Sequence, residues 1–293
     1  MAEDYLNGQL LLGDPDEFAQ EMIKLINDKE FSDVQFVIGE ERQSIHAHKC
    51  ILAARCEVFR AMFSTPTTPD DNAPLILSDI KPVVFMAVLE FIYTNSCNLS
   101  SDLVIEVLAS AIEYGLDGLR KVCVRFMREN MTVGTVCEYV QAALTYDQVT
   151  LREECLQLIE QHTEEVFKTQ GFTEISDEAL IYILKSNKLM MDEIDILKKV
   201  TEWGTVNAVV TGLSLGEILK NVIIHIRYPL LDKDALSSIA AENKIKQYIP
   251  VTLIAAAWKF HALQKVDDPA DPQTTPRRGT VPRPSLRALG LTS

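Results

Sequence analysis

The residues best suited to chemistry lie close together in the sequence, at His46, His48, Cys50 and Cys56. Imidazole nitrogens and thiolates are ligands that zinc prefers, and a cysteine beside a histidine is a minimal pair for nucleophilic catalysis. The spacing matches neither a Cys-x-x-Cys nor a His-x-x-x-His clamp, and free cysteines are among the most buried residues. Because Cys50 and Cys56 precede apolar helical positions, we expect packed, unreactive thiols and no metal site.

Composition argues against several further kinds of chemistry. The glycine-rich motifs that cradle dinucleotides or phosphates are absent, and so is the His-Glu-x-x-His motif of zinc proteases. The 28 Lys and Arg residues face 42 Asp and Glu residues, which gives a formal charge of −14 that would repel the phosphates of nucleic acids. We therefore expect no enzymatic activity, no cofactor and no nucleic-acid partner.

The hydropathy pattern predicts neither a membrane span nor an export signal. The apolar stretch from Leu253 to Trp258, for example, is far shorter than the ~18 to 20 residues that a crossing needs. The chain starts with Met1-Ala2-Glu3-Asp4, which is acidic where a signal peptide is basic. We expect a protein of the cytoplasm or nucleus that contacts no membrane and keeps its 6 cysteines reduced and buried.

The elements that position these residues begin with a mixture of helical and strand periodicity. Asp14 and Pro15 predict the N-cap and first turn of a helix that reaches Asp28. Further elements are predicted as helices at 49–63 and from Pro82, and as strands at 31–38, 43–47 and 75–77. The helix from Pro82 would bury Val84, Phe85, Val88, Leu89 and Ile92. This mixture predicts a small sheet covered by helices.

The chain after Ser101 has helical periodicity, and part of it is repeated. Ala111, Tyr114, Leu119 and Cys123 recur in the same order as Ala143, Tyr146, Leu151 and Cys155. Each copy predicts two helices joined by a tight turn. A solenoid needs at least ~3 copies and only two are found, so the alternative is two hairpins within a larger helical domain. Helices are also predicted within 179–184, 194–203, 218–226 and 254–263.

The segment after Lys265 is rich in proline and poor in apolar residues, which predicts a disordered tail. Pro282-Arg283-Pro284 could adopt the polyproline conformation and bind an aromatic groove, and Thr275 or Thr280 could be phosphorylated. Most tails of this composition are only solvated.

Four pieces of sequence, taken together, resemble the BTB/POZ domain. In order they are Phe31–Val34, His46–Cys56, Phe59–Phe63 and Phe91–Thr94. The segment from Thr132 to about Pro229 is similar to the helical BACK domain that follows BTB in Kelch-like proteins, although Kelch repeats are absent. The resemblance implies the α+β class, with a BTB/POZ fold followed by an all-α BACK domain. The implied divisions are 1–30 (N-terminal segment and dimerisation helix), 31–130 (BTB/POZ), 131–265 (BACK-like) and 266–293 (disordered tail).

The resemblance also implies a homodimer in which the first helix packs across a two-fold axis. The helix carries an apolar stripe that a small domain cannot easily bury alone, formed by Phe18, Met22, Leu25 and Ile26. In the family an acidic and a basic residue line a charged pocket at this interface, and Asp33 and Lys49 match them. The alternative is that Asp33 caps a turn while Lys49 is solvated at the start of a helix.

Many relatives bind the cullin scaffold of a ubiquitin ligase. Phe63 and Tyr93 match positions of the family's cullin surface, although both could equally belong to the core. The loop from Ser64 to Asn72 lacks the hydrophobic-x-Glu motif of good binders, which leaves Asp70 or Asp71 to supply charge.

The resemblance therefore predicts a non-enzymatic, homodimeric protein-interaction module. The first functional prediction is a substrate adaptor of a cullin-RING ubiquitin ligase, in which BTB faces the cullin and BACK or the tail faces an unknown client. The alternative is a scaffold or oligomerisation protein that does not bind cullin.

Overall fold

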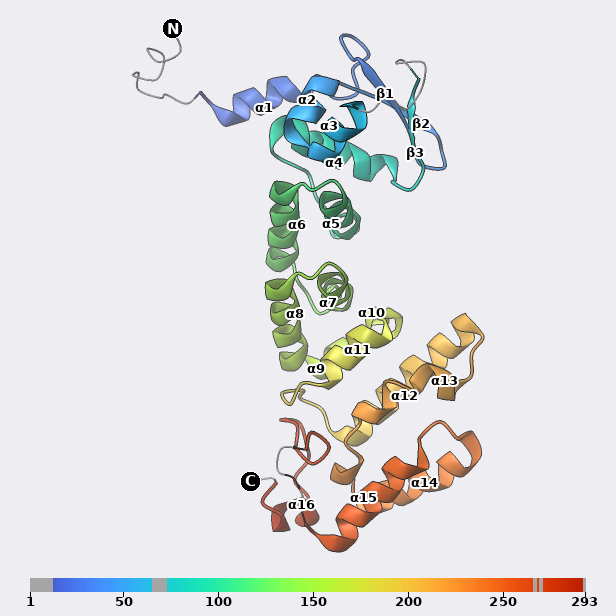
Figure 1. Cartoon of the computed structure of the whole chain (residues 1–293). Coiled ribbons are helices and arrows are strands. Elements are labelled where there is room, and N and C mark those ends of the chain that lie inside the picture. Colours follow the sequence, from blue (N-terminus) through green and yellow to red (C-terminus); the bar gives the residue numbers. More distant parts are fainter. Residues whose placement is uncertain (1–12, 65–72, 266–267, 269–270, 292–293) are drawn as a thin grey trace. The chain divides into compact units, whose positions relative to one another are not determined.

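The computed structural model describes residues 13–64, 73–265, 268 and 271–291, and the chain divides into two compact units, Met1–Asn130 and Met131–Ser293 (Figure 1). The N-terminal unit contains α1 (Pro15–Ile23), β1 (Val34–Ile38), β2 (Gln43–Ala47), α2 (Lys49–Arg55), α3 (Glu57–Ser64), β3 (Leu75–Leu77), α4 (Pro82–Thr94), α5 (Val104–Glu113) and α6 (Asp117–Glu129). The C-terminal unit contains α7 (Val136–Thr145), α8 (Val149–Gln161), α9 (Thr163–Val166), α10 (Gln170–Glu174), α11 (Asp177–Leu184), α12 (Glu193–Thr211), α13 (Leu215–Leu219), the 3-10 helices η2 (Ile223–His225) and η3 (Tyr228–Leu230), α14 (Lys233–Lys246), α15 (Val251–Leu263) and α16 (Pro284–Ala288).

The sheet of the N-terminal unit has the strand order β2-β1-β3. β1 and β2 form the predicted antiparallel hairpin, whereas β3 pairs with β1 in parallel. Gly39 adopts a left-handed conformation with φ of +69°, which suits the turn after β1. Alternation along β1 buries Phe36, whose ring lies 5.9 Å from that of Phe59 and 5.0 Å from that of Phe85. These aromatic contacts join the sheet to α3 and α4.

The predicted starts of α1 and α4 and the predicted buried face of α4 are confirmed, whereas α1 ends at Ile23 rather than at Asp28. The Asp14 side chain accepts a hydrogen bond from the Asp16 N–H at 2.9 Å, and Pro15 occupies the first turn of α1. On α4 the predicted inward residues are all buried, namely Val84, Phe85, Val88, Leu89 and Ile92. Cap chemistry and apolar spacing therefore locate the starts of both helices and the inward face of α4, but not the end of α1.

The stretch predicted as one helix from Lys49 to Phe63 is instead two helices. Cys56 lies between α2 and α3 in an extended conformation, with φ of −140°. Its thiol donates to the Tyr114 carbonyl at 3.2 Å, which anchors the break to the start of the turn before α6. Apolar periodicity continues across the break, and for this reason the sequence alone does not reveal it.

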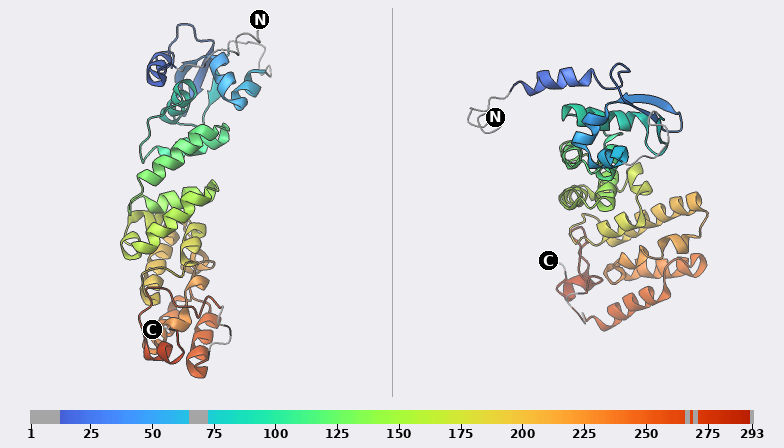
Figure 2. Two further views of the ribbon diagram at one scale, coloured as in Figure 1. Left: turned by 90° about the vertical axis from the view of Figure 1, so that its left-hand side faces the viewer. Right: turned by 45° about the horizontal axis from the view of Figure 1, so that its top comes forward.

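Both copies of the internal repeat fold as helical hairpins, α5–α6 in the N-terminal unit and α7–α8 in the C-terminal unit (Figures 1 and 2). The same backbone hydrogen bond closes each corner: the Leu116 N–H donates to the Ala111 carbonyl at 2.7 Å, and the Gln148 N–H donates to the Ala143 carbonyl at 2.8 Å. The repeated leucines and cysteines are fully buried, at positions 119, 123, 151 and 155. The two copies of the repeat therefore form the same turn between their helices.

The later helices are predicted less well. The range 218–226 contains the end of α13 and the 3-10 helix η2 rather than one helix, and α14 is not predicted at all. The buried side of α14 includes Asn243, whose side-chain amide bonds to the backbone of Ile249 at 2.7 and 2.8 Å. Because a polar residue occupies the inward face, the apolar pattern of α14 is weak.

The prediction of a disordered tail is wrong for residues 271–291. Arg277 is fully buried in an ion pair with Glu193, and Arg283 pairs with Asp192. Leu286, on α16, is fully buried against Leu230 and Phe260. A prediction of disorder from composition fails here because the segment is ordered by buried charge pairs rather than by many apolar side chains.

Within the described part of the chain, no helix combines the length and the hydrophobicity that crossing a bilayer requires.

Candidate functional site

The first helix and the turn after it carry an apolar stripe that the single chain covers only in part. Phe18 is 61% exposed and Ile23 is 47% exposed, and no residue of α1 is buried. Met22, Leu25 and Ile26, the other residues of the predicted stripe, are partly buried. A groove of about 430 Å³ adjoins the stripe and is lined by Ile23, Ile26, Val83, Met86, Ala87, Glu90, Asn98 and Leu103. Exposed apolar area of this kind marks a surface that associates with another protein.

Asp33 and Lys49 meet in the structure, but through the backbone. The Asp33 carboxylate accepts a hydrogen bond from the Lys49 N–H at 2.7 Å, in the first turn of α2. A carboxylate at a helix N-terminus satisfies a free N–H group and interacts favourably with the helix dipole. In the single chain the pair therefore caps α2, and its predicted role in a charged pocket between two copies stays a prediction.

The two described residues of the predicted cullin surface differ in burial. Tyr93 is only 3% exposed and belongs to the core, whereas Phe63 is partly buried and stacks on Phe59 with ring centroids 6.0 Å apart. Asp70 and Asp71 lie outside the described residues. Tyr93 is therefore a core residue, as the alternative prediction had it. Of the two described residues, Phe63 is the one with a partly exposed side chain.

Tyr93 instead supports the start of α2. Its hydroxyl oxygen accepts a hydrogen bond from the His48 N–H at 2.9 Å and lies 3.0 Å from His48 Nδ1, to which it can donate. Burial raises the pKa of Tyr93 to about 12, so the hydroxyl stays protonated.

Tyr93→Phe is expected to lower the free energy of unfolding by about 1–3 kcal/mol, because it leaves the buried His48 N–H without an acceptor. The midpoint of urea denaturation measures this loss. Tyr146→Phe removes a hydroxyl from a partly exposed tyrosine and serves as the control, with a change within about 0.5 kcal/mol. Equal midpoints for both variants would contradict the assigned support role.

The four side chains of the zinc and nucleophile hypotheses, His46, His48, Cys50 and Cys56, lie in different surroundings. His48 is buried beside Tyr93, whereas His46 is partly exposed with Nε2 3.5 Å from the Ser44 hydroxyl. Cys56 is buried, but Cys50 is exposed, which corrects the expectation of a packed thiol there. The structure, within its described ranges, holds no group of three or more His, Cys, Asp or Glu side chains placed to bind a metal.

Four cysteines that are buried or partly buried have raised pKa values. Burial raises the pKa of Cys97, Cys123 and Cys155 to about 12 and that of Cys137 to about 11. These thiols stay protonated at neutral pH and are poor nucleophiles.

We expect a thiol reagent to modify Cys50 of the native protein first, because Cys50 is exposed while Cys56, Cys123, Cys137 and Cys155 are buried. Intact mass measured over time at pH 7.5 should show one fast addition, which Cys50→Ser removes. A fast addition that persists in Cys50→Ser would contradict the assignment.

One pattern typical of serine hydrolases, Gly-x-Ser-x-Gly, occurs at Gly212–Gly216 and has a structural explanation. Ser214 is the N-cap of α13: its hydroxyl donates to a Glu217 carboxylate oxygen at 2.6 Å and accepts from the Glu217 N–H at 3.3 Å. The residues before it end α12 rather than a strand, so the geometry of a nucleophile elbow is not met. The pattern here is a capping box.

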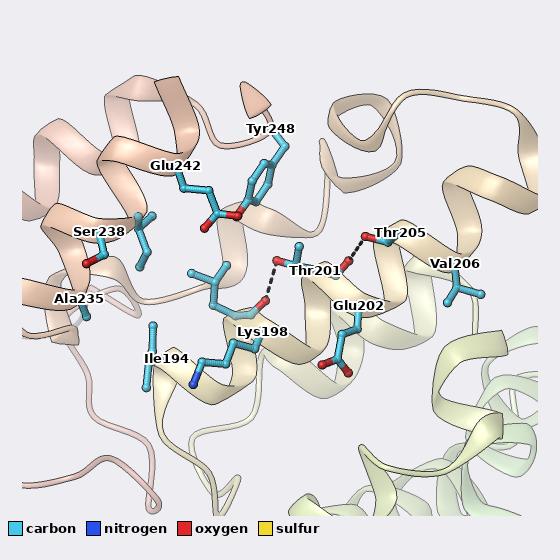
Figure 3. A pocket seen from close by; sticks show the side chains of 12 residues that line it. Ile194, Lys198, Thr201, Glu202, Thr205, Val206, Ala235, Ser238, Glu242 and Tyr248 are labelled. Atoms are coloured by element: carbon cyan, nitrogen blue, oxygen red, sulfur yellow. Dashed lines mark hydrogen bonds between the residues drawn. The ribbon is translucent and has the colours of Figure 1, made fainter. Parts of the chain in front are cut away.

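A second groove, of about 700 Å³, lies between α12 and α14 (Figure 3). Its apolar lining includes Leu197, Ile239 and Tyr248. The three charged lining residues are paired along their own helices: Lys198 with Asp195 at 2.9 Å, Glu202 with Lys199 at 2.6 Å and Glu242 with Lys246 at 2.6 Å. The groove therefore presents mainly apolar surface, and the sequence did not indicate it because α14 was missed.

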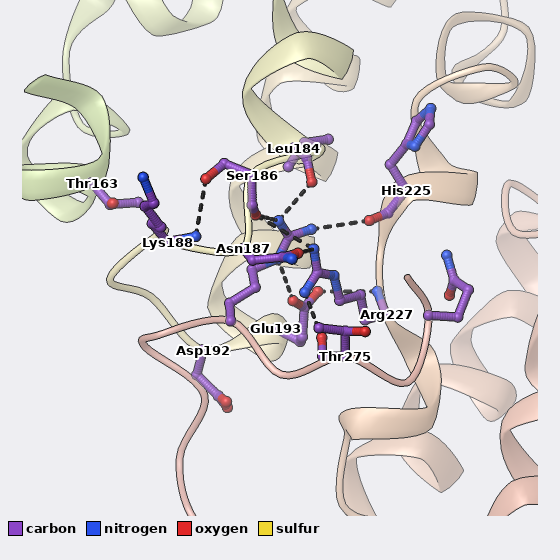
Figure 4. Close-up of polar contacts among 12 residues, drawn as sticks. Thr163, Leu184, Ser186, Asn187, Lys188, Asp192, Glu193, His225, Arg227 and Thr275 are labelled. Atoms are coloured by element: carbon purple, nitrogen blue, oxygen red, sulfur yellow. Dashed lines mark hydrogen bonds and ion pairs between the residues drawn. The ribbon is translucent and has the colours of Figure 1, made fainter. Parts of the chain in front are cut away.

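The sequence also did not indicate a buried polar cluster around Glu193 (Figure 4). Glu193 accepts from the backbone N–H of Arg227 at 3.0 Å and from Arg277 Nε at 2.5 Å. Burial and the neighbouring Arg277 lower the pKa of Arg227 to about 10, so it remains charged at neutral pH. No periodicity marks such a cluster, because its members are far apart in sequence.

Comparison with known proteins identifies both parts of the chain. Residues 22–131 match the family model of the BTB/POZ domain, and residues 136–241 match that of the BACK domain, "BTB And C-terminal Kelch". BTB/POZ domain-containing protein 19 of Homo sapiens is 39% identical over 284 residues, which cover 97% of this chain and 98% of that protein, and the Bos taurus protein gives the same values. BTB/POZ domain-containing protein 9 of Drosophila melanogaster is 28% identical over 78% of this chain and 31% of its own length. The chain therefore belongs to the BTB/POZ family and combines two protein-interaction domains, an N-terminal BTB domain and a helical BACK domain.

Proposed function

We propose that this chain is a non-enzymatic, homodimeric adaptor of the cytoplasm or nucleus that brings a client protein to a cullin-RING ubiquitin ligase. The observation that carries the proposal is the apolar stripe of α1, with Phe18 61% exposed beside the groove between α1 and α4. A second copy of the chain would cover this surface. Partly exposed Phe63 supports a cullin contact on the same unit.

The loop sequence favours a second candidate, a dimeric scaffold that does not bind cullin. The stretch Ser64–Asn72 contains neither a large apolar residue nor Glu, so it lacks the anchor expected of good cullin binders. A buried anchor commonly contributes about 2 kcal/mol or more to an interface. The two candidates therefore differ in one measurable quantity, the affinity for cullin.

Calorimetric titration of the purified full-length chain with a purified cullin N-terminal domain tests the adaptor proposal. We expect one cullin per protomer and, for the double variant Thr67→Leu and Pro69→Glu, binding at least about tenfold tighter, because this change creates a hydrophobic-x-Glu motif. The same two residue types in reverse order, Thr67→Glu and Pro69→Leu, form the control. Absence of heat of binding for the wild-type chain would exclude the adaptor role and leave the scaffold.

A further inference from the structure

The C-terminal unit holds part of its own chain in the manner of a bound peptide. Residues 271–291, here called the docked segment, follow α15 and lie against the loop between α11 and α12. The N–H groups of Arg278 and Gly279 donate to the carbonyls of Asn187 and Leu189, each at 2.9 Å. Before α16 the segment is neither helix nor strand and contains two turns, closed by the bonds from the Thr274 N–H to the Asp271 carbonyl and from the Thr280 N–H to the Arg277 carbonyl. Its main-chain bonds to the loop resemble those that a bound peptide makes to a receptor.

Two arginines anchor the docked segment in acidic sites. Arg277, fully buried, donates from Nε to Glu193 at 2.5 Å, and its other nitrogens donate to the carbonyls of Leu184, Ser186 and His225. Arg283 binds both oxygens of Asp192, at 3.1 and 2.5 Å. Bidentate arginine–carboxylate pairs are strong and geometrically specific.

The receptor side carries the complementary charge. Three receptor carboxylates face the docked segment, those of Asp192, Glu193 and Asp232. The receptor also contributes a cation, Arg227, whose guanidinium donates to the Thr275 carbonyl of the segment at 2.5 Å. Without the segment this surface would hold more carboxylates than guanidinium groups. Its charge therefore favours a ligand with two arginines.

Two further positions restrict which peptide fits. A Cβ atom at Gly279 would lie 2.0 Å from the Met191 nitrogen, so the close approach of the two backbones requires glycine. Leu286 is fully buried against Leu230 and Phe260. Together with the arginines these positions define the pattern Arg-x-Gly-x-x-x-Arg-x-x-Leu.

We propose that Asp192, Glu193 and the apolar surface of Leu230 and Phe260 are a receptor site for peptides with this pattern, and that the docked segment occupies it in competition with a partner protein carrying the same pattern. The inference goes beyond the proposed function and does not depend on cullin binding. A ligand tethered by a short linker acts at an effective concentration in the ~mM range. The intact chain therefore masks the site, and a partner gains access when the segment is released.

The test uses the full-length protein with a protease site inserted after Lys265. A fluorescent synthetic peptide of residues 271–291 is added before and after cleavage, with the cleaved protein first passed through gel filtration at low concentration, and anisotropy reports binding. We expect cleavage to tighten binding of the peptide at least about 100-fold, because the tethered competitor is lost.

Three peptide variants test the pattern without altering the protein. Arg277→Ala and Gly279→Ala should each weaken binding at least about 30-fold, while Arg278→Ala, which changes an exposed neighbour of the same charge, should bind within about twofold of the natural peptide. The proposal is overturned if cleaved protein neither releases its segment nor takes up peptide, because the segment is then an ordinary part of the core. Equal binding of all four peptides also overturns it, since the attraction is then unspecific.

Discussion

Arg277→Ala in the full-length chain is expected to lower the free energy of unfolding of the C-terminal unit by about 3–5 kcal/mol, the range typical when one partner of a buried ion pair is removed. The substitution leaves the Glu193 carboxylate, which is inaccessible to water, without its guanidinium partner. For a unit of this size, the loss corresponds to a melting temperature lower by roughly 6–20 °C.

The neighbouring residue provides a matched control. Arg278 has the same charge, but its side chain is exposed, so Arg278→Ala should change stability by no more than about 0.5 kcal/mol. Urea denaturation followed by circular dichroism measures both variants. Truncation after Lys265 should reproduce at least the loss seen for Arg277→Ala, because it also removes the Arg283–Asp192 pair and the buried Leu286. A truncated chain as stable as the full-length protein would show that the docked segment contributes nothing to folding.

Phe18→Glu combined with Met22→Glu is expected to convert a dimer into monomers of 32.9 kDa. In the proposed dimer these side chains lie across a two-fold axis, so each substitution places like charges opposite each other and removes apolar contact. The single chain should stay folded, because Phe18 is exposed and Met22 is only partly buried.

Light scattering coupled to gel filtration measures the mass, and Gln20→Glu is the control. Gln20 lies on the same helix and is exposed, but its position falls outside the apolar stripe, so the added charge should leave the dimer intact. A double variant that keeps the mass of the wild-type protein would exclude α1 as the dimer contact. Monomers of the wild-type chain at high concentration would exclude the homodimer altogether.

Local signals predicted the N-terminal unit well because they act over a few residues. The Asp14 cap and the inward face of α4 follow from side chains that lie within a turn or two of one another. Alternation around Phe36 located β1, although this strand begins at Val34 rather than at Phe31. It could not reveal that β3 pairs in parallel with β1. The break at Cys56 also escaped prediction, because its bond to Tyr114 joins positions far apart in the chain.

The candidate sites were predicted unevenly for the same reason. The apolar stripe of α1 follows from helical spacing, and in the single chain Phe18 is exposed while the other stripe residues are partly buried. Tyr93 matched a surface position by sequence but is buried, since only packing decides which side of a helix faces the core.

By itself the sequence determined that this protein is a BTB–BACK chain whose first helix has an apolar face. Cap residues, periodicity and family motifs are local signals, because they depend on residues close together in the sequence. Only the tertiary structure decided that Arg277 reaches Glu193 and that the proline-rich end of the chain docks. Composition predicts disorder where apolar residues are few, but a small number of buried charges can order a segment if distant carboxylates and carbonyls are placed to receive them. That placement depends on how the helices pack, and it cannot be predicted from the spacing of residues in any one segment of the sequence.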